Sequence, residues 1–317
     1  MIGKDLLTVG EIPAADIIRL VKAAASLKAR QTRTARQPLL GRSLGLLFEK
    51  PSTRTRVSFE AGMNQLGGQS LFLSASDIQL CRGESIADTA RVLSRYLDGL
   101  VVRTYDHAIV EEWARQATIP VINGLTDLHH PCQALSDLLT ILERIGKLKG
   151  VKMAYLGDGN NVANSLVESA AKTGMRISLA CPQGYEPDPR IMDLAREEAR
   201  RTGGTIEMGR DPQIAMKDAD VVYTDVWTSM GQEREEARRL KALAPYQLNE
   251  RLMRAAKPNA IVMHCLPAHR GQEISAAVLD GPQSVVLDQA ENRLHMQKAI
   301  LIELLGKANR NRRGTRA

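Results

Sequence analysis

The hydrophobic positions of the chain alternate between two spacings. Short apolar runs typical of buried strands, such as Ser43–Lys50, precede stretches with apolar residues at helical spacing, such as Val57–Leu66. Further strands are predicted at Ser70–Leu73, Gly99–Val102, Pro120–Gly124, Lys152–Leu156, Arg176–Ala180, Thr205–Met208, Asp220–Thr224, Ala260–His264 and Ser284–Asp288. Further helices are predicted at Ala14–Ala29, Glu84–Leu97, Ile109–Gln116, Asn160–Thr173 and Asp188–Arg201. This alternation predicts an α/β fold with parallel strands covered by helices.

Glycine and lysine cluster at Gly146–Gly150, which indicates a domain boundary. A chain of 317 residues is also too long for one small core. We therefore expect two doubly wound domains, each with a central parallel sheet flanked by helices. The first would span residues 1–146 and the second residues 147–289, and a last helix, 290–317, would pack back on the first domain.

Composition favours a cytoplasmic globular protein. Hydrophobic residues make up 44% and charged residues 25% of the chain. Apolar runs are shorter than a membrane span, and Met1–Asp5 has no signal-peptide character, so we expect no membrane association. The four cysteines are far apart and form no C-x-x-C pair, which predicts reduced thiols.

The positive net charge is concentrated at the end of the sequence. Leaving out the five basic residues from Lys307 onward lowers the formal net charge from +7 to +2. Aromatic residues, on which single-stranded bases would stack, are only 3% of the chain. We therefore interpret the basic tail as a solvated end of the last helix and expect no nucleic-acid partner.

The run Ser52–Arg56, Ser-Thr-Arg-Thr-Arg, lies at a predicted strand-to-helix turn. Such a turn directs unpaired N–H groups and the positive helix end at one point, and here hydroxyls and guanidiniums are added. The combination suits an oxyanion, and phosphate in particular. The alternative is a Ser/Thr helix cap followed by two solvated arginines.

A second turn, Gly157-Asp158-Gly159-Asn160-Asn161, raises the possibility of dinucleotide binding. The fingerprint is incomplete, because Val162 stands where the third glycine belongs. The next strand also ends in Leu179–Pro182, which offers no carboxylate for a ribose. The turn therefore favours a different ligand, and no cofactor is expected.

Three more segments place polar residues where a ligand would bind. In His129–Gln133, Pro131 suits the first helical position, so that His130 and Gln133 either face one pocket or form ordinary buried contacts. The segments Asp225–Gly231 and His264–Pro267 follow predicted strands, and ligands of parallel sheets collect at those ends. Asp225 would pair with a cationic amine, with Cys265 beside it.

A metal site built from His264, Cys265 and His269 is conceivable in the last of these segments. The spacing of the three residues matches neither a helical nor a knuckle pattern of zinc ligands. We expect no metal.

Four motifs occur in order: Ser-Thr-Arg-Thr-Arg, His-Pro-x-Gln, Asp-x-Trp-x-Ser-Met-Gly and His-Cys-Leu-Pro. In this order they resemble the aspartate/ornithine carbamoyltransferase family over nearly the whole chain. The first two resemble motifs shared by both branches, and the last two resemble the ornithine branch. The resemblance implies transfer of the carbamoyl group of carbamoyl phosphate to the δ-amine of L-ornithine, giving L-citrulline and phosphate. The alternatives are another amine acceptor, such as aspartate, or a non-catalytic anion-binding homologue.

The same resemblance implies roles for individual residues. Those implied to bind carbamoyl phosphate are Ser52, Thr53, Arg54, Thr55, Gln79, Arg103, His130, Gln133, Cys265, Leu266 and Arg293. Those implied to bind ornithine are Asn161, Asp225, Ser229 and Met230. The catalytic group would be Arg54, Arg103, His130, Asp225 and Cys265.

The segment Ile78–Ser85 resembles a loop that reaches the neighbouring subunit in this family. The resemblance implies a homotrimer in which Gln79 touches the neighbour's carbamoyl phosphate. Cys81 stands where a glycine is usual, which affects the loop because a side chain restricts positive φ angles.

Overall fold

The structure, a computed structural model, describes residues 3–29, 37–74, 78–228, 231 and 233–306. Its contacts divide the chain into two compact units. Unit 1 comprises Met1–Leu139 and Asn292–Ala317, and unit 2 comprises Thr140–Glu291. The dividing points fall inside two helices, α5 (Pro131–Ile145) and α12 (Val286–Leu305).

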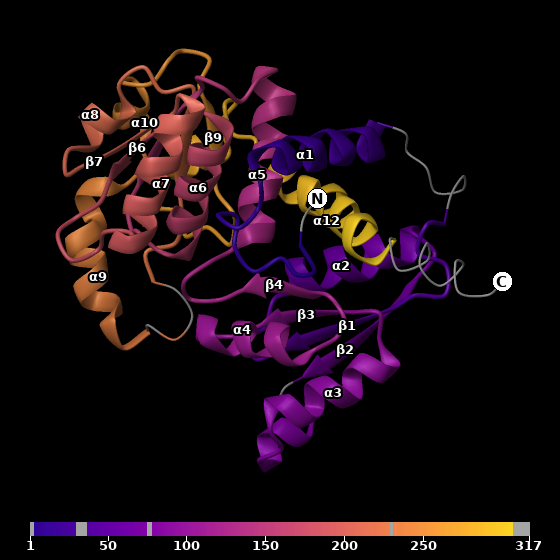
Figure 1. Cartoon of the computed structure of the whole chain (residues 1–317). Helices are drawn as coiled ribbons and strands as arrows, with labels where there is room; N and C mark the ends of the chain where they lie inside the picture. Colours follow the sequence, from indigo (N-terminus) through magenta and orange to yellow (C-terminus); the bar gives the residue numbers. More distant parts are fainter. Residues whose placement is uncertain (1–2, 30–36, 75–77, 229–230, 232, 307–317) are drawn as a thin grey trace. The chain divides into compact units, whose positions relative to one another are not determined.

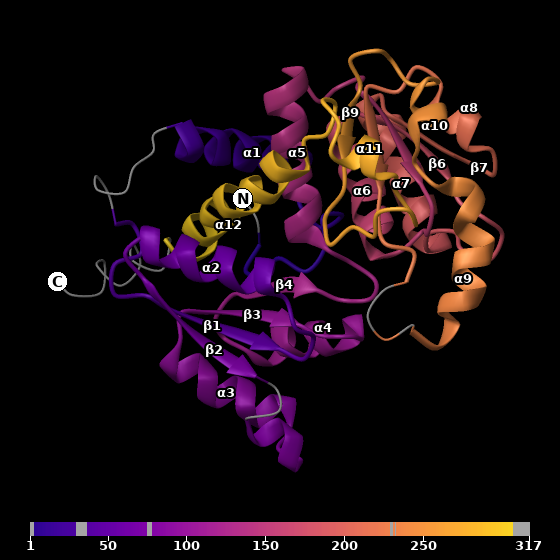
Figure 2. The same ribbon diagram turned by 180° about the vertical axis from the view of Figure 1, so that it is seen from behind.

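Unit 1 is built on a four-stranded parallel sheet with the strand order β2-β1-β3-β4. Its strands are β1 (Ser43–Phe48), β2 (Gln69–Ser74), β3 (Gly99–Arg103) and β4 (Val121–Leu125). Its helices are α1 (Ala14–Ala29), α2 (Thr53–Gln65), η1 (Gln79–Arg82), α3 (Ile86–Tyr96) and α4 (His107–Gln116). Figures 1 and 2 show α2 and α12 on one face of this sheet, with α3 and α4 on the other.

The core of unit 1 forms where the helices cover the sheet. Leu47, Val102 and Val121 from three strands pack with Trp113 of α4 in one apolar cluster, because alternate strand residues face the same side. On the opposite face, Gly62 of α2 lets the stem of Lys298 of α12 approach closely.

Unit 2 contains a five-stranded parallel sheet with the order β7-β6-β5-β8-β9. Its strands are β5 (Lys152–Leu156), β6 (Arg176–Ala180), β7 (Thr205–Gly209), β8 (Val221–Thr224) and β9 (Ile261–Met263). Its helices are α6 (Asn161–Thr173), α7 (Pro189–Thr202), α8 (Pro212–Met216), η2 (Glu233–Glu235), α9 (Glu236–Leu243), η3 (Ala244–Tyr246), α10 (Glu250–Met253) and α11 (Ala276–Leu279). Helices α6 and α7 cover one face (Figure 1), while α8, α10 and α11 enclose an apolar cluster on the other.

Each sheet has a point at which the chain changes direction. In unit 1, β1 continues through α2 to β2 on one side, and β3 continues through α4 to β4 on the other. In unit 2, β5 and β8 diverge in the same way. Phe48 is paired with Arg103 and Leu156 with Thr224 at the carboxyl ends of these strands. Ligands of open α/β sheets bind at such switch points, so these two places are where a site is expected.

The predicted fold class is confirmed, and most predicted elements agree with the structure within two residues. One prediction is wrong: Ser284–Asp288 is not a strand. Only Ser284 forms a bridge, to Val262, and α12 already begins at Val286. A short apolar run has no helical or strand periodicity of its own, so its sequence does not distinguish the two. Helix α2 also begins earlier than predicted, at Thr53.

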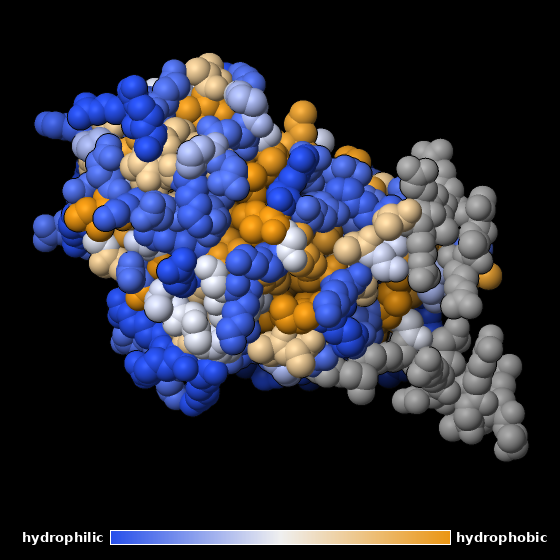
Figure 3. Space-filling model, turned by 90° about the horizontal axis from the view of Figure 1, so that it is seen from above, coloured by the Kyte–Doolittle hydropathy of each residue, from blue (hydrophilic) through white to orange (hydrophobic). Residues whose placement is uncertain are grey.

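Hydrophilic residues cover much of the face shown in Figure 3, and apolar residues are visible between them. The exposed large apolar side chains of unit 1 include Val57, Leu71, Phe72, Val92 and Tyr96. Among the described helices, none combines the length and the apolar composition that crossing a bilayer requires.

Candidate active site

The amino end of α2 forms the base of the site in unit 1. Ser52 caps the helix: its Oγ accepts the Thr55 N–H at 3.2 Å and donates to Thr55 Oγ1 at 3.0 Å. Thr55 is buried, Arg54 is half-buried and Thr53 is exposed. The predicted cap and the predicted cluster of donors therefore coexist, with the positive end of a 13-residue helix added to them.

Arg293 of α12 connects this helix end to α5. Its Nη2 donates to Thr55 Oγ1 at 2.8 Å, and its Nη1 donates to Gln133 Oε1 at 2.5 Å. The same Nη1 lies 3.3 Å from His130 Nε2. Because the side chain is only 3% exposed, its charge acts in a weakly screened environment. One guanidinium thus gathers three segments that are far apart in the sequence.

His130 is held as a neutral ring. Burial lowers its pKa well below the usual value, and the charges of Arg293, Arg103 and Arg54 lower it further. A guanidinium has only donors, so His130 Nε2 accepts in its contact with Arg293. A neutral imidazole among three positive charges suits a ligand that carries both an anionic group and a polar carbonyl.

Arg103 lies at the end of β3, beside the end of β1. It is 5% exposed, and its Nε donates to the carbonyl oxygen of Lys50 at 3.2 Å. Lys50 is itself buried, forms an ion pair with Asp127 and lies 4.1 Å from the ring centroid of Tyr105. Lys50 was not predicted as a site residue, although its place directly before the Pro51–Arg56 turn was a usable signal.

Gln133 is oriented by a second residue that the sequence reasoning missed. Its Nε2 donates to Asp137 Oδ1 at 2.8 Å, one helical turn further along α5. The amide oxygen is thereby turned toward Arg293. The i, i+4 spacing of the two residues was the signal available in the sequence.

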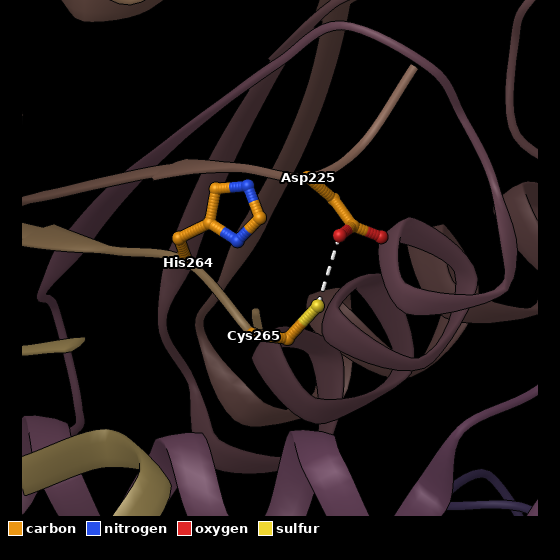
Figure 4. A group of neighbouring side chains, drawn as sticks. All are labelled: Asp225, His264 and Cys265. Carbon is orange, nitrogen blue, oxygen red and sulfur yellow. Dashed lines mark hydrogen bonds between the residues drawn. The ribbon is translucent and has the colours of Figure 1, made fainter. Parts of the chain in front are cut away.

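Asp225 is the centre of the group in unit 2 (Figure 4). Its side chain follows β8 and is 4% exposed. Oδ1 accepts from Cys265 Sγ at 2.9 Å, and Oδ2 accepts from Asn160 Nδ2 at 2.7 Å. Asn160 also caps α6 through Oδ1, which accepts from the N–H groups of Val162 and Ala163. The contact to Asp225 thus comes from Asn160, while the predicted Asn161 is the buried first residue of α6.

His264, Cys265 and Leu266 form a tightly connected turn after β9. His264 Nδ1 accepts the Leu266 N–H at 2.9 Å, and His264 Nε2 lies 3.1 Å from Oε1 of the buried Glu273. These contacts place the ring hydrogen on Nε2, where it faces the carboxylate. They hold Leu266 at a φ of 57°, a left-handed conformation that is uncommon for a branched residue.

The donor atoms of Asp225, His264 and Cys265 lie within 4.8 Å of one another, as metal ligands would. Both ring nitrogens of His264 are already engaged, one as acceptor and one facing Glu273. The thiol of Cys265 is engaged with Asp225. A metal ligand needs a free lone pair, so the arrangement favours a hydrogen-bonded group over a metal site. His269, the third residue of the conceivable site, has an exposed ring near Glu273.

Comparison with known proteins identifies the family. Residues 4–143 match the carbamoyl-P binding domain of aspartate/ornithine carbamoyltransferases, and residues 149–304 match their Asp/Orn binding domain. The chain belongs to the aspartate/ornithine carbamoyltransferase family.

Individual relatives within the carbamoyltransferase family match nearly end to end. The ornithine carbamoyltransferase of Syntrophus aciditrophicus is 56% identical over 94% of this chain and 98% of its own. The protein of Pyrococcus furiosus named "Ornithine carbamoyltransferase, anabolic" is 53% identical over 96% of this chain and 97% of its own. A solved ornithine carbamoyltransferase structure from Pyrococcus furiosus has a TM-score of 0.92 at 52% identity, covering 95% of this chain and 97% of that one.

Two of the four carbamoyltransferase motifs begin directly after strands of the switch points, at Ser52 after β1 and at Asp225 after β8, and the other two follow the edge strands β4 and β9. In unit 1 the structure brings together Ser52, Thr55, His130, Gln133 and Arg293. Gln79 is exposed on η1, and the side chain of Cys81 lies outside the described residues. Ser229 and Met230 also lie outside the described residues.

Proposed function

We propose that the chain transfers the carbamoyl group of carbamoyl phosphate to the δ-amine of L-ornithine, forming L-citrulline and phosphate. The observation that carries the proposal is the cluster of Arg54, Arg103 and Arg293 around neutral His130 at the amino end of α2. Family membership over both matched domains supports the same reaction.

On unit 1, the proposal assigns each group a part of carbamoyl phosphate. The donors of the α2 end, Ser52–Thr55, would hold the phosphate together with Arg103 and Arg293, since guanidiniums bind oxyanions through paired donors. His130 would bond the carbonyl oxygen. The Gln133 oxygen, oriented by Asp137, would accept from the carbamoyl NH2.

On unit 2, the proposal assigns the acceptor amine to Asp225. Its carboxylate is fixed by Asn160 and Cys265, which places a negative group at the end of β8 for an ammonium ligand. Asn161, Ser229 and Met230 would bind the rest of ornithine, while Cys265 and Leu266 would lie near the reacting carbon. An ammonium ion has no lone pair for attack, so ornithine would react as the neutral δ-amine. The proton that the nitrogen loses once the C–N bond has formed would pass either to the departing phosphate or to Cys265 Sγ, as the thiol hydrogen moves to Asp225.

The chemistry is acyl transfer through a tetrahedral oxyanion. Negative charge grows on the carbonyl oxygen and on the leaving phosphate, where Arg54, Arg103 and His130 would supply donors. Donors fixed in advance are usually the largest catalytic contribution, and one lost donor costs about 3 kcal/mol. Holding both substrates also removes much of the entropic barrier to their encounter.

An assay of the purified chain with carbamoyl phosphate and L-ornithine tests the proposal. We expect citrulline and phosphate in equal amounts, with little product when L-aspartate replaces ornithine. Absence of citrulline at saturating substrate concentrations would overturn the proposal that the chain is an ornithine carbamoyltransferase. A faster reaction with aspartate would instead assign the chain to the other branch.

We also propose a homotrimer in which Gln79 reaches a neighbouring subunit. The exposed Gln79 and the exposed Leu71 and Phe72 on edge strand β2 support this proposal, since apolar side chains at a sheet edge favour association. Native mass spectrometry should give three times the 34.8 kDa chain mass or a multiple of it. Mixing Gln79→Ala chains with Cys265→Ala chains should restore activity, because some mixed sites would contain both native residues. A monomer would contradict the proposal.

We further propose a cytoplasmic role in arginine biosynthesis. The relative from Pyrococcus furiosus is named anabolic, and the three described free cysteines suit a reducing compartment. Complementation of an arginine-requiring strain that lacks this activity tests the direction of the pathway. Failure to grow without arginine, despite expressed and active protein, would argue against it.

A further inference from the structure

A buried ion pair lies behind Asp225 in unit 2. Arg239 of α9 pairs with Asp158, which belongs to the turn after β5. The two residues are 5% and 7% exposed. The Nε of Arg239 also donates to the carbonyl oxygen of Trp227 at 2.5 Å, and its guanidinium lies 5.0 Å from the ring centroid of Tyr185.

These contacts join the two segments that determine where Asp225 lies. Asp158 is two residues before Asn160, whose amide donates to Asp225, and Trp227 is two residues after Asp225. The indole of Trp227 also lies against Gly157, where an added Cβ would approach its Nε1 to 3.2 Å. Arg239 therefore contacts the segment that carries Asn160, through Asp158, and the segment that carries Asp225, through the Trp227 carbonyl oxygen. It does not contact the Asp225 carboxylate itself.

We propose that Arg239 and Asp158 are a positioning pair that fixes Asp225 and Asn160 for the acceptor amine. The inference rests on the proposed function, because it assigns the pair to the ornithine side of that reaction. It predicts that the pair determines the binding of ornithine and leaves the binding of carbamoyl phosphate nearly unchanged.

The burial of the pair supports a positioning role over a purely stabilising one. Taking two charges out of water costs about as much as their attraction returns, so such a pair is weak support for stability. Loss of one partner, in contrast, leaves an uncompensated charge that moves toward water. Because Arg239 also holds the Trp227 carbonyl, that movement would carry the segment after Asp225 with it.

The pair is also sensitive to protons. Burial raises the pKa of Asp158 to about 7, which exceeds the opposing effect of Arg239. The titratable and charged groups around Asp158 are Arg239, Asp225, Glu235, Tyr155 and Cys181. Below neutral pH Asp158 becomes uncharged, so its attraction for Arg239 weakens.

Steady-state kinetics of the full chain test the pair. Arg239→Gln should raise the KM for ornithine about tenfold or more while changing the KM for carbamoyl phosphate less than about twofold. Arg239→Lys, which keeps the charge and loses the planar fork, should give a smaller change in the same direction. Arg238→Gln removes the exposed neighbour on the same helix and serves as the matched control, with both constants unchanged. Equal ornithine KM values for Arg239→Gln and Arg238→Gln would overturn the proposal.

The pH dependence separates positioning from general destabilisation. Asp158→Asn resembles the protonated aspartate, so its ornithine KM should exceed that of the wild type above pH 7 and approach it as the pH falls below 7. Deprotonation of ornithine itself affects both proteins equally and cancels in the ratio. A ratio that stays constant with pH would contradict the role of Asp158.

Tryptophan emission gives a readout that does not depend on turnover. The chain has two tryptophans, so Trp113→Phe leaves Trp227 as the only one. In that background Arg239→Gln should shift the Trp227 emission toward the red, and Arg238→Gln should not. An unshifted spectrum in correctly folded protein would refute the positioning pair. If the wild type forms no citrulline, the proposed function fails, while this measurement still decides whether the pair positions Trp227.

Discussion

The thiol of Cys265 and the carboxylate of Asp225 form a hydrogen bond of 2.9 Å between the ends of two neighbouring strands. Asp225 follows β8 and Cys265 follows β9, so the parallel pairing of the strands brings the two side chains together (Figure 4). Asn160 holds the other carboxylate oxygen. The plane of the carboxylate is therefore fixed from two directions, which a positioned acceptor amine requires.

Replacing the thiol tests what it contributes to catalysis. Cys265→Ala should lower kcat/KM for ornithine about tenfold or more, since a hydrogen bond to a charged group is worth about 1.5–3 kcal/mol. Cys265→Ser keeps a donor and should retain more activity than the alanine variant. If Cys265→Ala stays within a few-fold of the wild type, the thiol takes no part in proton transfer. Initial-rate assays of citrulline formation provide the measurement.

Lysine substitutions at Arg54 and, as a control, at Arg56 test the anion site at the start of α2. Arg54→Lys keeps the charge but loses the planar guanidinium, and kcat should fall on the order of 100-fold if one transition-state donor is lost. Arg56→Lys is the control. Arg56 lies about half a turn further along α2, where its exposed side chain pairs with Glu60 and stacks on Phe72. The activity of this variant should remain within about twofold of the wild type. Similar losses in both variants would show that α2, and not Arg54, is affected.

The histidine pair beside the anion site predicts acid sensitivity. Burial lowers the pKa of His107 to about 4. The ring centroids of His107 and His129 are 4.8 Å apart, and His129 lowers this pKa further. An unfolded histidine titrates near pH 6.5, so between about pH 6.5 and 4 the unfolded chain binds a proton that the folded chain does not. The free energy of unfolding therefore falls as the pH falls through this range.

Urea titrations at several pH values test this assignment. The free energy of unfolding of His107→Asn should fall less between about pH 7.5 and 5.5 than that of the wild type. The asparagine removes the titration and keeps a polar group near Thr126 Oγ1, which lies 3.1 Å from His107 Nδ1. His269→Asn, which changes an exposed ring, should follow the wild-type pH dependence. Identical pH profiles for all three proteins would contradict the assignment to His107.

We expect that replacing Gln297 of α12 with leucine stabilises the protein. The side chain is fully buried, and neither amide atom has a hydrogen-bond partner among the described residues. Gln297→Leu removes two unsatisfied polar atoms and should raise the free energy of unfolding by about 1–3 kcal/mol. Gln289→Leu on the same helix is the control, because that amide accepts from the His264 N–H and donates to Tyr223 Oη. The control should destabilise the protein; equal effects of the two variants would refute the argument.

The sequence predicted the parts of the site that depend on local order along the chain. Ser52 before α2 and Pro131 at the start of α5 have local signals, so the places of Thr55, His130 and Gln133 at helix starts were predictable. Strand alternation likewise predicted that Asp225 and Cys265 would follow neighbouring strands of a parallel sheet.

The contacts that support these residues were not predictable in the same way. Arg239 is one of several arginines in a charged stretch, and only the fold shows that it is buried against Asp158 while Arg238 is exposed. Glu273 similarly looks like a surface residue in the sequence and is fully buried beside His264. Contacts between residues far apart in the sequence determine that Arg239 and Glu273 are buried, and the periodicity of the sequence contains no information about these contacts.

The divergence of β1 from β3 and of β5 from β8 has a consequence for how selectivity can change. The residues of unit 1 proposed to hold carbamoyl phosphate lie on α2, α5 or α12 or follow a strand of one sheet, whereas the residues proposed for ornithine come after β5 and β8 of the other. The loop after β9 carries Cys265 and Leu266, which are proposed to lie near the reacting carbon, so the loop after β8 is the one that can be exchanged without altering a residue proposed for the donor. Libraries confined to the loop after β8 should yield variants that carbamoylate other amines while their affinity for carbamoyl phosphate stays constant.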